Sequence, residues 1–204
     1  AELRAGEKFY INLGEHHYYD DGILVEYYKD NYKLTDKIGI GSSQGLRYIQ
    51  HNKPLECGVD FGNQCSMVLG QPNGRYYYLL KDLHTLPPEC SKELAKQFLD
   101  FFKGHTKKVL DMYYDRSGNQ YQQVKRDWAT EIKDHSEKYD GFSTGWTVNL
   151  KSRNQKTLSQ EAEYTFVKKL FAEYYPGLPM MKIDKYQCKH LKSSLERSEE
   201  HTSE

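Results

Sequence analysis

The chain has 204 residues, of which 37% are hydrophobic, and its 29 acidic and 29 basic residues balance. A chain of this size can bury one hydrophobic core, so we expect a single domain. The mean hydropathy of −0.89 and the lack of a long apolar run exclude a transmembrane helix. The balanced charge gives no strongly basic signature for nucleic acid at neutral pH. The 18 tyrosines suit strands whose rings pack while their hydroxyls reach water, although they would also suit stacking on bases.

The N-terminal part predicts short strands separated by polar loops. Residues 8–13 and 23–28 have the composition and flanking turns of strands. The loop between them, 14–22, contains two adjacent histidines and two aspartates. Adjacent histidines point to opposite sides of an extended chain, so we expect a polar loop there rather than a metal site. Residues 38–43 read as a strand end and a turn.

The cysteines allow two different interpretations. There are four of them, which permits two disulfides with three possible connectivities: Cys57, Cys65, Cys90 and Cys188. Cys57 and Cys65 flank a short loop that contains glycine, so they could pair with each other. Gln64-Cys65 also resembles cysteine hydrolases, in which a thiolate attacks the substrate. The residues after Cys65 favour a strand rather than the helix that usually lowers a thiol pKa, so we expect a buried or disulfide-bonded cysteine.

The middle of the chain predicts a hairpin followed by a helix. Residues 66–81 surround a tight turn at 71–74 and predict a β-hairpin. A helix is expected from Ser91 to Lys103, because the Ser91 hydroxyl can cap its first turn. Gly104 can take the left-handed conformation that ends many helices.

The second half of the chain predicts further strands and one more helix. Residues 109–114 and 121–128 read as two strands around a turn, and 127–140 as a solvated, highly charged excursion with an exposed His135. A strand follows at 145–150, and an amphipathic helix at 157–175. The element order predicts an α+β fold, with an antiparallel or mixed sheet and helices packed on it.

Gly104-His105-Thr106-Lys107 is the segment whose residues best suit catalysis. If the segment is extended, His105 and Lys107 point the same way. The imidazole could then attack phosphorus or exchange protons, while the ammonium neutralises phosphoryl oxygens. The alternative is a helix that continues through Gly104, with His105 as a polar interruption of a core stripe. The glycine and the tyrosines that follow count against one long helix.

The same segment, with Val109-Leu110, Asp115 and Gly118 after it, resembles the first His-x-Lys motif of the deoxyribonuclease II family. That family belongs to the phospholipase D-like group. Other stretches occur in the family's order over most of residues 8–182: Tyr78–Leu80, Pro87-Pro88, Gly145, Thr147, 166–173 and Tyr175–Leu178. The resemblance implies that the chain is the N-terminal half of a nuclease with two similar halves of sheet and helices.

The resemblance further implies an acid endonuclease that hydrolyses DNA without a divalent metal or cofactor, in lysosomes or after secretion. His105 would be one of two catalytic histidines, one of which attacks phosphorus, and Lys107 would hold the phosphate. The second His-x-Lys is not visible, because His190-Leu191-Lys192 comes too early to belong to a second half. A missing C-terminal half or a homodimer partner would have to supply it, so this chain alone is expected to be inactive.

The two ends and two rival functions complete the predictions. The natural domain is expected to be 1–196, because 197–204 match the translation of a common sequencing adapter. One rival is a secreted, tyrosine-rich binding protein without catalysis, or an inactive relative of the nucleases. Its ligand binding would not depend on His105. The other rival is a hydrolase centred on Cys65, which would need an accessible thiol.

Overall fold

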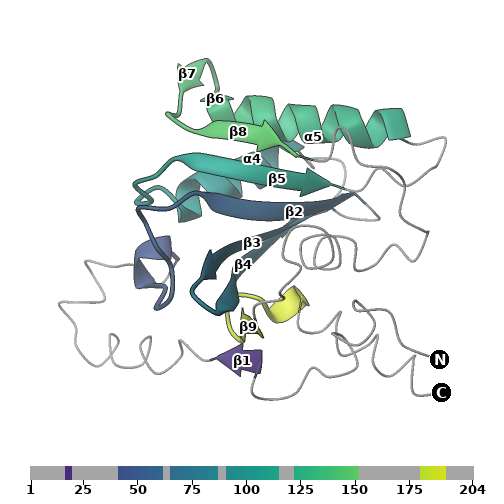
Figure 1. Cartoon of the computed structure of the whole chain (residues 1–204). Coiled ribbons are helices and arrows are strands. Elements are labelled where there is room, and N and C mark those ends of the chain that lie inside the picture. The colour runs from purple at the N-terminus through teal and green to yellow at the C-terminus, as the bar shows by residue number, and fades with distance from the viewer. Residues whose placement is uncertain are drawn as a thin grey trace, which may run out of the picture.

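The described part of the chain is built around a seven-stranded mixed sheet (Figure 1). The computed structural model describes residues 17–19, 41–61, 65–86, 91–114, 122–151 and 180–191. In space the strands follow the order β1-β9-β4-β3-β2-β5-β8. Their bounds are β1 (Tyr18–Tyr19), β2 (Leu55–Phe61), β3 (Cys65–Asn73), β4 (Tyr76–Thr85), β5 (Val109–Tyr114), β8 (Thr147–Leu150) and β9 (Met180–Asp184).

The strands β2, β3 and β4 form an antiparallel meander. β2 and β3 pair from Glu56 opposite Gly70 to Phe61 opposite Cys65. β3 and β4 are joined by a tight turn at Gly74, whose φ of 61° lies in the left-handed region that glycine enters without steric cost. The hairpin predicted over 66–81 is therefore confirmed, with strands that extend further on both sides.

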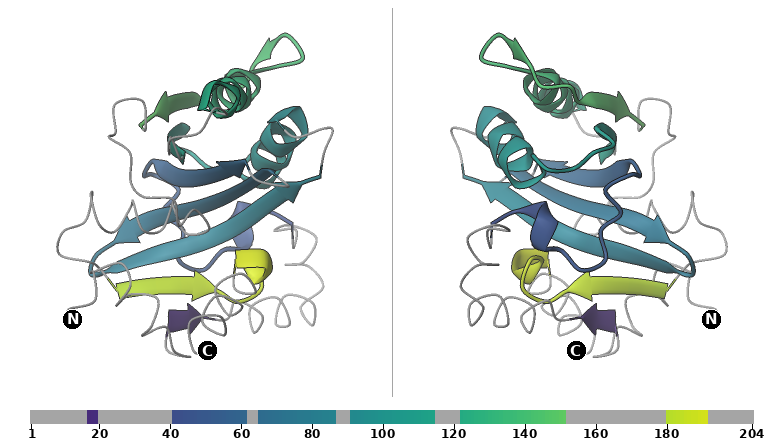
Figure 2. Two further views of the ribbon diagram at one scale, coloured as in Figure 1. Left: turned by 90° about the vertical axis from the view of Figure 1, so that its right-hand side faces the viewer. Right: turned by 90° about the vertical axis from the view of Figure 1, so that its left-hand side faces the viewer.

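On the other side of β2 the sheet is parallel. β5 pairs with β2, and β8 pairs with β5, both in parallel. Parallel neighbours need a crossover connection, and two helices provide it: α4 (Ser91–Phe101) between β4 and β5, and α5 (Gln122–Glu137) between β5 and β8. Both helices lie on the same face of the sheet (Figure 2). The predicted α+β class, with a mixed sheet and helices packed on it, is confirmed in this form.

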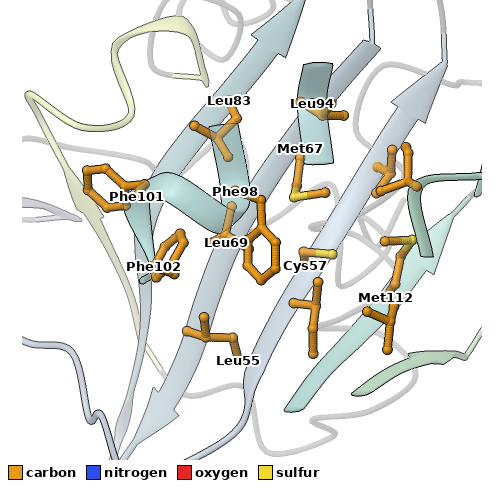
Figure 3. Packing of buried hydrophobic residues seen from close by; sticks show 14 of the residues in the cluster. Leu55, Cys57, Met67, Leu69, Leu83, Leu94, Phe98, Phe101, Phe102 and Met112 are labelled. Carbon is orange, nitrogen blue, oxygen red and sulfur yellow. The ribbon is translucent and has the colours of Figure 1, made fainter. Parts of the chain in front are cut away.

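The hydrophobic core fills the space between the sheet and these helices (Figure 3). Alternate residues of β2, namely Leu55, Cys57 and Val59, face this layer and are buried. Fully burying one large apolar side chain contributes roughly 1.5–3 kcal/mol, so this layer is the main source of stability. The other buried members drawn and labelled with them are Met67, Leu69, Leu83, Leu94, Phe98, Phe101, Phe102 and Met112.

Four tyrosines pack together at the side of this core. Tyr48 stacks on Tyr78 with ring centroids 4.6 Å apart, and Tyr19 meets the Tyr48 ring edge-on at 4.9 Å. The ring of Tyr76 lies 6.0 Å from that of Tyr78. For these four tyrosines, the prediction that the rings pack is confirmed.

Helix α4 ends earlier than predicted, and Gly104 has a different role. The predicted helix extended to Lys103, whereas α4 ends at Phe101. Gly104 does not have a positive φ, so the expected left-handed helix end is wrong. The flexible side chain of Gln44 comes close to Gly104: its Cδ would lie 2.8 Å from a β carbon at this position, so a larger residue there would require Gln44 to move.

Helix α5 replaces a predicted strand and a predicted solvated excursion. Residues 121–128 were expected to be a strand, and 127–140 a polar excursion. Instead the chain is helical from Gln122 to Glu137, and Ala129, Ile132 and Ser136 are buried. Their spacing of three and four residues is the helical period, which the charged residues between them hid. His135, predicted to be exposed, is half-buried.

A short hairpin connects α5 to β8. Its strands are β6 (Lys138–Tyr139) and β7 (Phe142–Ser143), and the turn between them has φ values of 48° at Asp140 and 86° at Gly141. Two positive φ values are typical of the turns that match the twist of two-residue hairpins. The hairpin projects beyond the end of α5 (Figure 2). The strand predicted at 145–150 is confirmed as β8.

Several predictions lie outside the described residues. These are the strands at 8–13 and 23–28, the helix at 157–175 and the tail at 197–204. The single domain over 1–196 stays a prediction. The loop at 14–22 was only partly right, because Tyr18 and Tyr19 form β1, which pairs in parallel with β9. In the described ranges there is no helix of the length and apolarity needed to cross a bilayer.

Candidate functional site

His105, the predicted catalytic histidine, is buried with 1% of its surface exposed. Its Nε2 lies 2.7 Å from the backbone carbonyl oxygen of Lys53, and because a carbonyl only accepts, Nε2 carries the proton. The ring stacks on Trp146 at a centroid distance of 5.8 Å. Within the described residues, its buried Nδ1 has no hydrogen-bond partner. The imidazole is therefore a packed part of the interior.

The charge state of His105 agrees with this placement. Burial lowers the pKa of His105 to about 4; the hydrogen bond to Lys53 acts against this, and the nearby His51 and Lys108 add to it. The Lys108 ammonium lies 5.1 Å from the centroid of the Trp146 ring and donates to the carbonyl oxygen of His105 at 2.9 Å. The ring is therefore neutral at physiological pH, and its Nε2 is already occupied.

Lys107 does not accompany His105. The backbone N–H groups of Thr106 and Lys107 both donate to the carbonyl oxygen of His51, at 3.1 and 2.8 Å. These bonds bend the segment, so the alternation expected of an extended chain does not arise. As a result His105 is buried and Lys107 is exposed. The predicted catalytic pair of His105 and Lys107 finds no support in this geometry.

The cysteines form no reactive site in the described residues. Cys57, Cys65 and Cys188 are buried free thiols, so the possible disulfide between Cys57 and Cys65 is not formed, and the expectation of a buried Cys65 is confirmed. The two lie on adjacent strands but out of register, since Cys57 is opposite Leu69. A buried Cys65 cannot meet a substrate, which argues against the cysteine hydrolase. Cys90 lies outside the described residues.

A different polar group lies at the carboxyl end of β2. This strand is the point where the sheet changes from antiparallel pairing, with β3, to parallel pairing, with β5. Asp60, near the end of β2, is exposed. In the register of the sheet Asp60 is opposite Ser66, and Ser66 is opposite His84. Directly opposed residues share a face, so these three side chains lie on the face away from α4 and α5.

The turn after β9 packs beside His84. The rings of His84 and His190 are stacked with centroids 5.0 Å apart. The Leu191 N–H donates to Oδ2 of Asp82 at 2.8 Å, and the Asp82 N–H donates to the carbonyl oxygen of Gln187 at 3.0 Å. Desolvation raises the pKa of Asp82, although the bond from Leu191 and the nearby positive side chains oppose the shift. The turn and β4 are thus joined by a ring contact and by hydrogen bonds on both sides of Asp82.

The capacity of this surface to hold a metal ion rests on Asp60. Carboxylate oxygens are the ligands that Mg²⁺ and Mn²⁺ prefer. Across the ranges that the structure describes, however, no three His, Cys, Asp or Glu side chains come together to hold an ion. In the sequence, Asp115 follows directly after Tyr114, the last residue of β5, and lies outside the described ranges. The described residues alone therefore do not supply a complete metal site.

Comparison with solved structures finds viral terminases and their nuclease domains. The human cytomegalovirus terminase nuclease domain, soaked with Mn, matches with 14% identity and a TM-score of 0.42 over 66% of this chain and 64% of that domain. The nuclease domain of the P22 large terminase matches with 12% identity and a TM-score of 0.42 over 72% of this chain and 70% of that one. The large terminase from a thermophilic bacteriophage matches with 11% identity and a TM-score of 0.42 over 72% of this chain and 33% of that one. This chain therefore spans less than two thirds of the cytomegalovirus domain.

These comparisons overturn the resemblance to the deoxyribonuclease II family. No family model and no curated protein matches the chain. The solved structures named above are terminases or terminase nuclease domains and not phospholipase D-like nucleases. The family prediction, including the half-molecule of the phospholipase D-like type, is therefore wrong. The histidine mechanism inferred from it loses its basis, and secretion stays a prediction.

Proposed function

We propose that the chain is a nuclease that hydrolyses DNA phosphodiesters and that Asp60 is its central acidic residue. The observation that carries the proposal is the position of Asp60: exposed, near the carboxyl end of the strand where the pairing of the sheet changes from antiparallel to parallel. In open sheets with helical crossovers, ligands bind outside the carboxyl ends of the strands at such a switch point. An acidic side chain at this place suits a site for a cation and a phosphate.

Asp60 would act as an oxygen ligand and would position the substrate. A divalent cation bound there would neutralise the phosphodiester and lower the pKa of a bound water. His84, on the same face two strands away, would lie beside the bound nucleic acid. The alternative, a non-catalytic binding protein whose tyrosines contact a ligand, is less favoured, because Tyr19, Tyr48 and Tyr78 pack on one another.

The test is conversion of supercoiled plasmid in the presence of Mg²⁺ or Mn²⁺. We expect cleavage that EDTA stops, and a loss of about 100-fold or more in the Asp60→Asn variant, as for removal of an acidic group in the reaction. Asp100→Asn, an exposed acid on α4 across the sheet, is the matched control and should cleave normally. Full activity of Asp60→Asn would refute the proposal.

A further inference from the structure

The turn at 185–191 is fixed in place by bonds to β4 and to itself. Oδ1 of Asp184 accepts the backbone N–H groups of Tyr186 and Gln187, at 2.9 and 3.0 Å. The side chain of Lys81 donates to Oε1 of Gln187 at 3.0 Å. The thiol of the buried Cys188 donates to the carbonyl oxygen of Leu79 at 3.6 Å. The turn is thus a rigid part of the sheet edge, whose outer side chains are held at defined positions.

The outward side chains of this turn have the chemistry of a nucleic-acid contact. Lys189 is exposed, and Tyr186 is 47% exposed. The Lys189 ammonium lies 5.7 Å from the centroid of the Tyr186 ring. The neighbouring Lys185 and His190 add further nitrogen donors, and the carboxylates of Asp82 and Asp184 accept N–H bonds of the turn itself. Cationic groups beside an exposed aromatic ring are what proteins use to bind a single strand, by contacts to phosphate and stacking on a base.

The turn lies at a suitable distance from Asp60. His84, which stacks on His190, is level with Asp60 and separated from it by one intervening strand. Adjacent strands are about 4.8 Å apart, so two spacings place the His84 backbone roughly 10 Å from that of Asp60. At about 3.4 Å per nucleotide along a stacked strand, this is a separation of about three nucleotides. A strand of about this length can therefore extend from Asp60 to His84, and the stacking of His84 on His190 places the turn beside this end of it.

We infer that the turn at 185–191, together with His84, is a binding subsite for a DNA strand, with Lys189 on a phosphate and Tyr186 on a base. Its role beside a cleavage site rests on the proposed function of Asp60, while the binding itself does not. His84 and His190 join the turn to the Asp60 end of the sheet, so the strand would run from the turn across the ends of β4, β3 and β2.

Binding is tested with fluorescein-labelled oligothymidylate, by fluorescence anisotropy in EDTA so that no cleavage interferes. Lys189→Ala and Tyr186→Ala are expected to weaken binding by about fivefold or more each, the lower end of what stacking on one base contributes. Lys96→Ala, which removes an exposed lysine from α4 on the other face, and Phe142→Ala, which removes an exposed ring from the β6–β7 hairpin, are the matched controls. The controls should bind as the unchanged protein does. Thermal unfolding of each variant checks that it is folded.

The outcomes separate this inference from the proposed nuclease. If Tyr186→Ala and Lys189→Ala bind no more weakly than their controls, the subsite is refuted, even where Asp60→Asn abolishes cleavage. If these two variants lose binding while the unchanged protein cleaves no DNA, the subsite stands and the nuclease fails. A weakening by Lys189→Ala that Lys96→Ala matches, with Tyr186→Ala unchanged, would indicate general charge attraction and would also refute the subsite.

Discussion

His105 and Lys53 are joined by a hydrogen bond of 2.7 Å between Nε2 and the backbone carbonyl oxygen, across 52 positions of the sequence. The bond fastens the loop before β2 to the segment that leads from α4 into β5. Because the donor is a buried, neutral ring stacked on Trp146, this hydrogen bond stabilises the folded structure. The histidine that looked most reactive in the sequence thus stabilises the structure.

Replacing His105 by Ala should therefore reduce stability. The change removes a buried hydrogen bond and the packing against Trp146, which together suggest a loss of about 2–4 kcal/mol. Urea unfolding measures it. Lys107→Ala, at an exposed position in the same segment, should change the free energy of unfolding by less than about 0.5 kcal/mol. Equal effects of the two changes would show that His105 is not part of the packed interior.

The same histidine should make stability depend on pH. Its pKa is about 4 in the folded protein, against an ordinary value of about 6.5 when unfolded. The unfolded chain therefore takes up the proton first as the pH falls, so this contribution is complete above about pH 6.5 and is lost towards pH 4. His105→Gln keeps an N–H donor without a titrating ring, so its stability should fall less over this range. Parallel curves for the two proteins would contradict the assignment.

Glu137 should protect the outer edge of β8. Its Oε2 accepts the backbone N–H of Val148 at 2.9 Å, and its Oε1 accepts from Lys133 at 2.7 Å. The carboxylate thus occupies a donor that an edge strand would otherwise offer to another chain. Glu137→Ala should cost about 1–3 kcal/mol in urea unfolding, and size-exclusion chromatography should show more self-association. Asp134→Ala, an exposed acid on the same helix, is the control and should change neither.

Gly70 should not tolerate a side chain. A β carbon there would lie 2.6 Å from Cε1 of Tyr77 and 2.9 Å from the backbone oxygen of Tyr78. Tyr77 is fully buried and its hydroxyl donates to Oε2 of Glu56 at 3.0 Å, so the ring cannot move away easily. Gly70→Ala is expected to destabilise the protein by about 1–3 kcal/mol. Gly41→Ala, where no atom lies within 4 Å, should leave the unfolding midpoint nearly unchanged.

Local elements with a clear signal could be predicted from the sequence. The hairpin over β3 and β4 had a turn dipeptide between two apolar runs, and β5 had a continuous run from Val109 to Tyr114. Helix α5 could not be read in the same way, because the buried residues described in it, Ala129, Ile132 and Ser136, stand among charged residues. This buried stripe is recognised only once the sheet that it covers is known.

The candidate site could not be found from local patterns. Gly58-Val59-Asp60 shows an acidic residue that ends a buried run, which was the available signal. The position of Asp60 suggests a functional site only because β2 is the strand where the pairing changes direction. That property of β2 follows only from the long-range order of the sheet. For His105 the motif suggested chemistry, and its catalytic role stays a prediction; its burial and its hydrogen bond to Lys53 depend on the three-dimensional structure and could not be predicted from the motif.

The most direct test of the central claim measures the rates at which the Asp60→Asn and Asp100→Asn variants cleave a DNA duplex with saturating Mn²⁺. The two rates are compared under conditions in which both variants have the same free energy of unfolding. Both variants lose one exposed carboxylate, but only Asp60 lies near the carboxyl end of β2, where the pairing of the sheet changes direction. We predict a rate for Asp60→Asn that is about 100-fold or more below that of Asp100→Asn. Equal rates for the two variants would contradict the assignment of Asp60 to the active site.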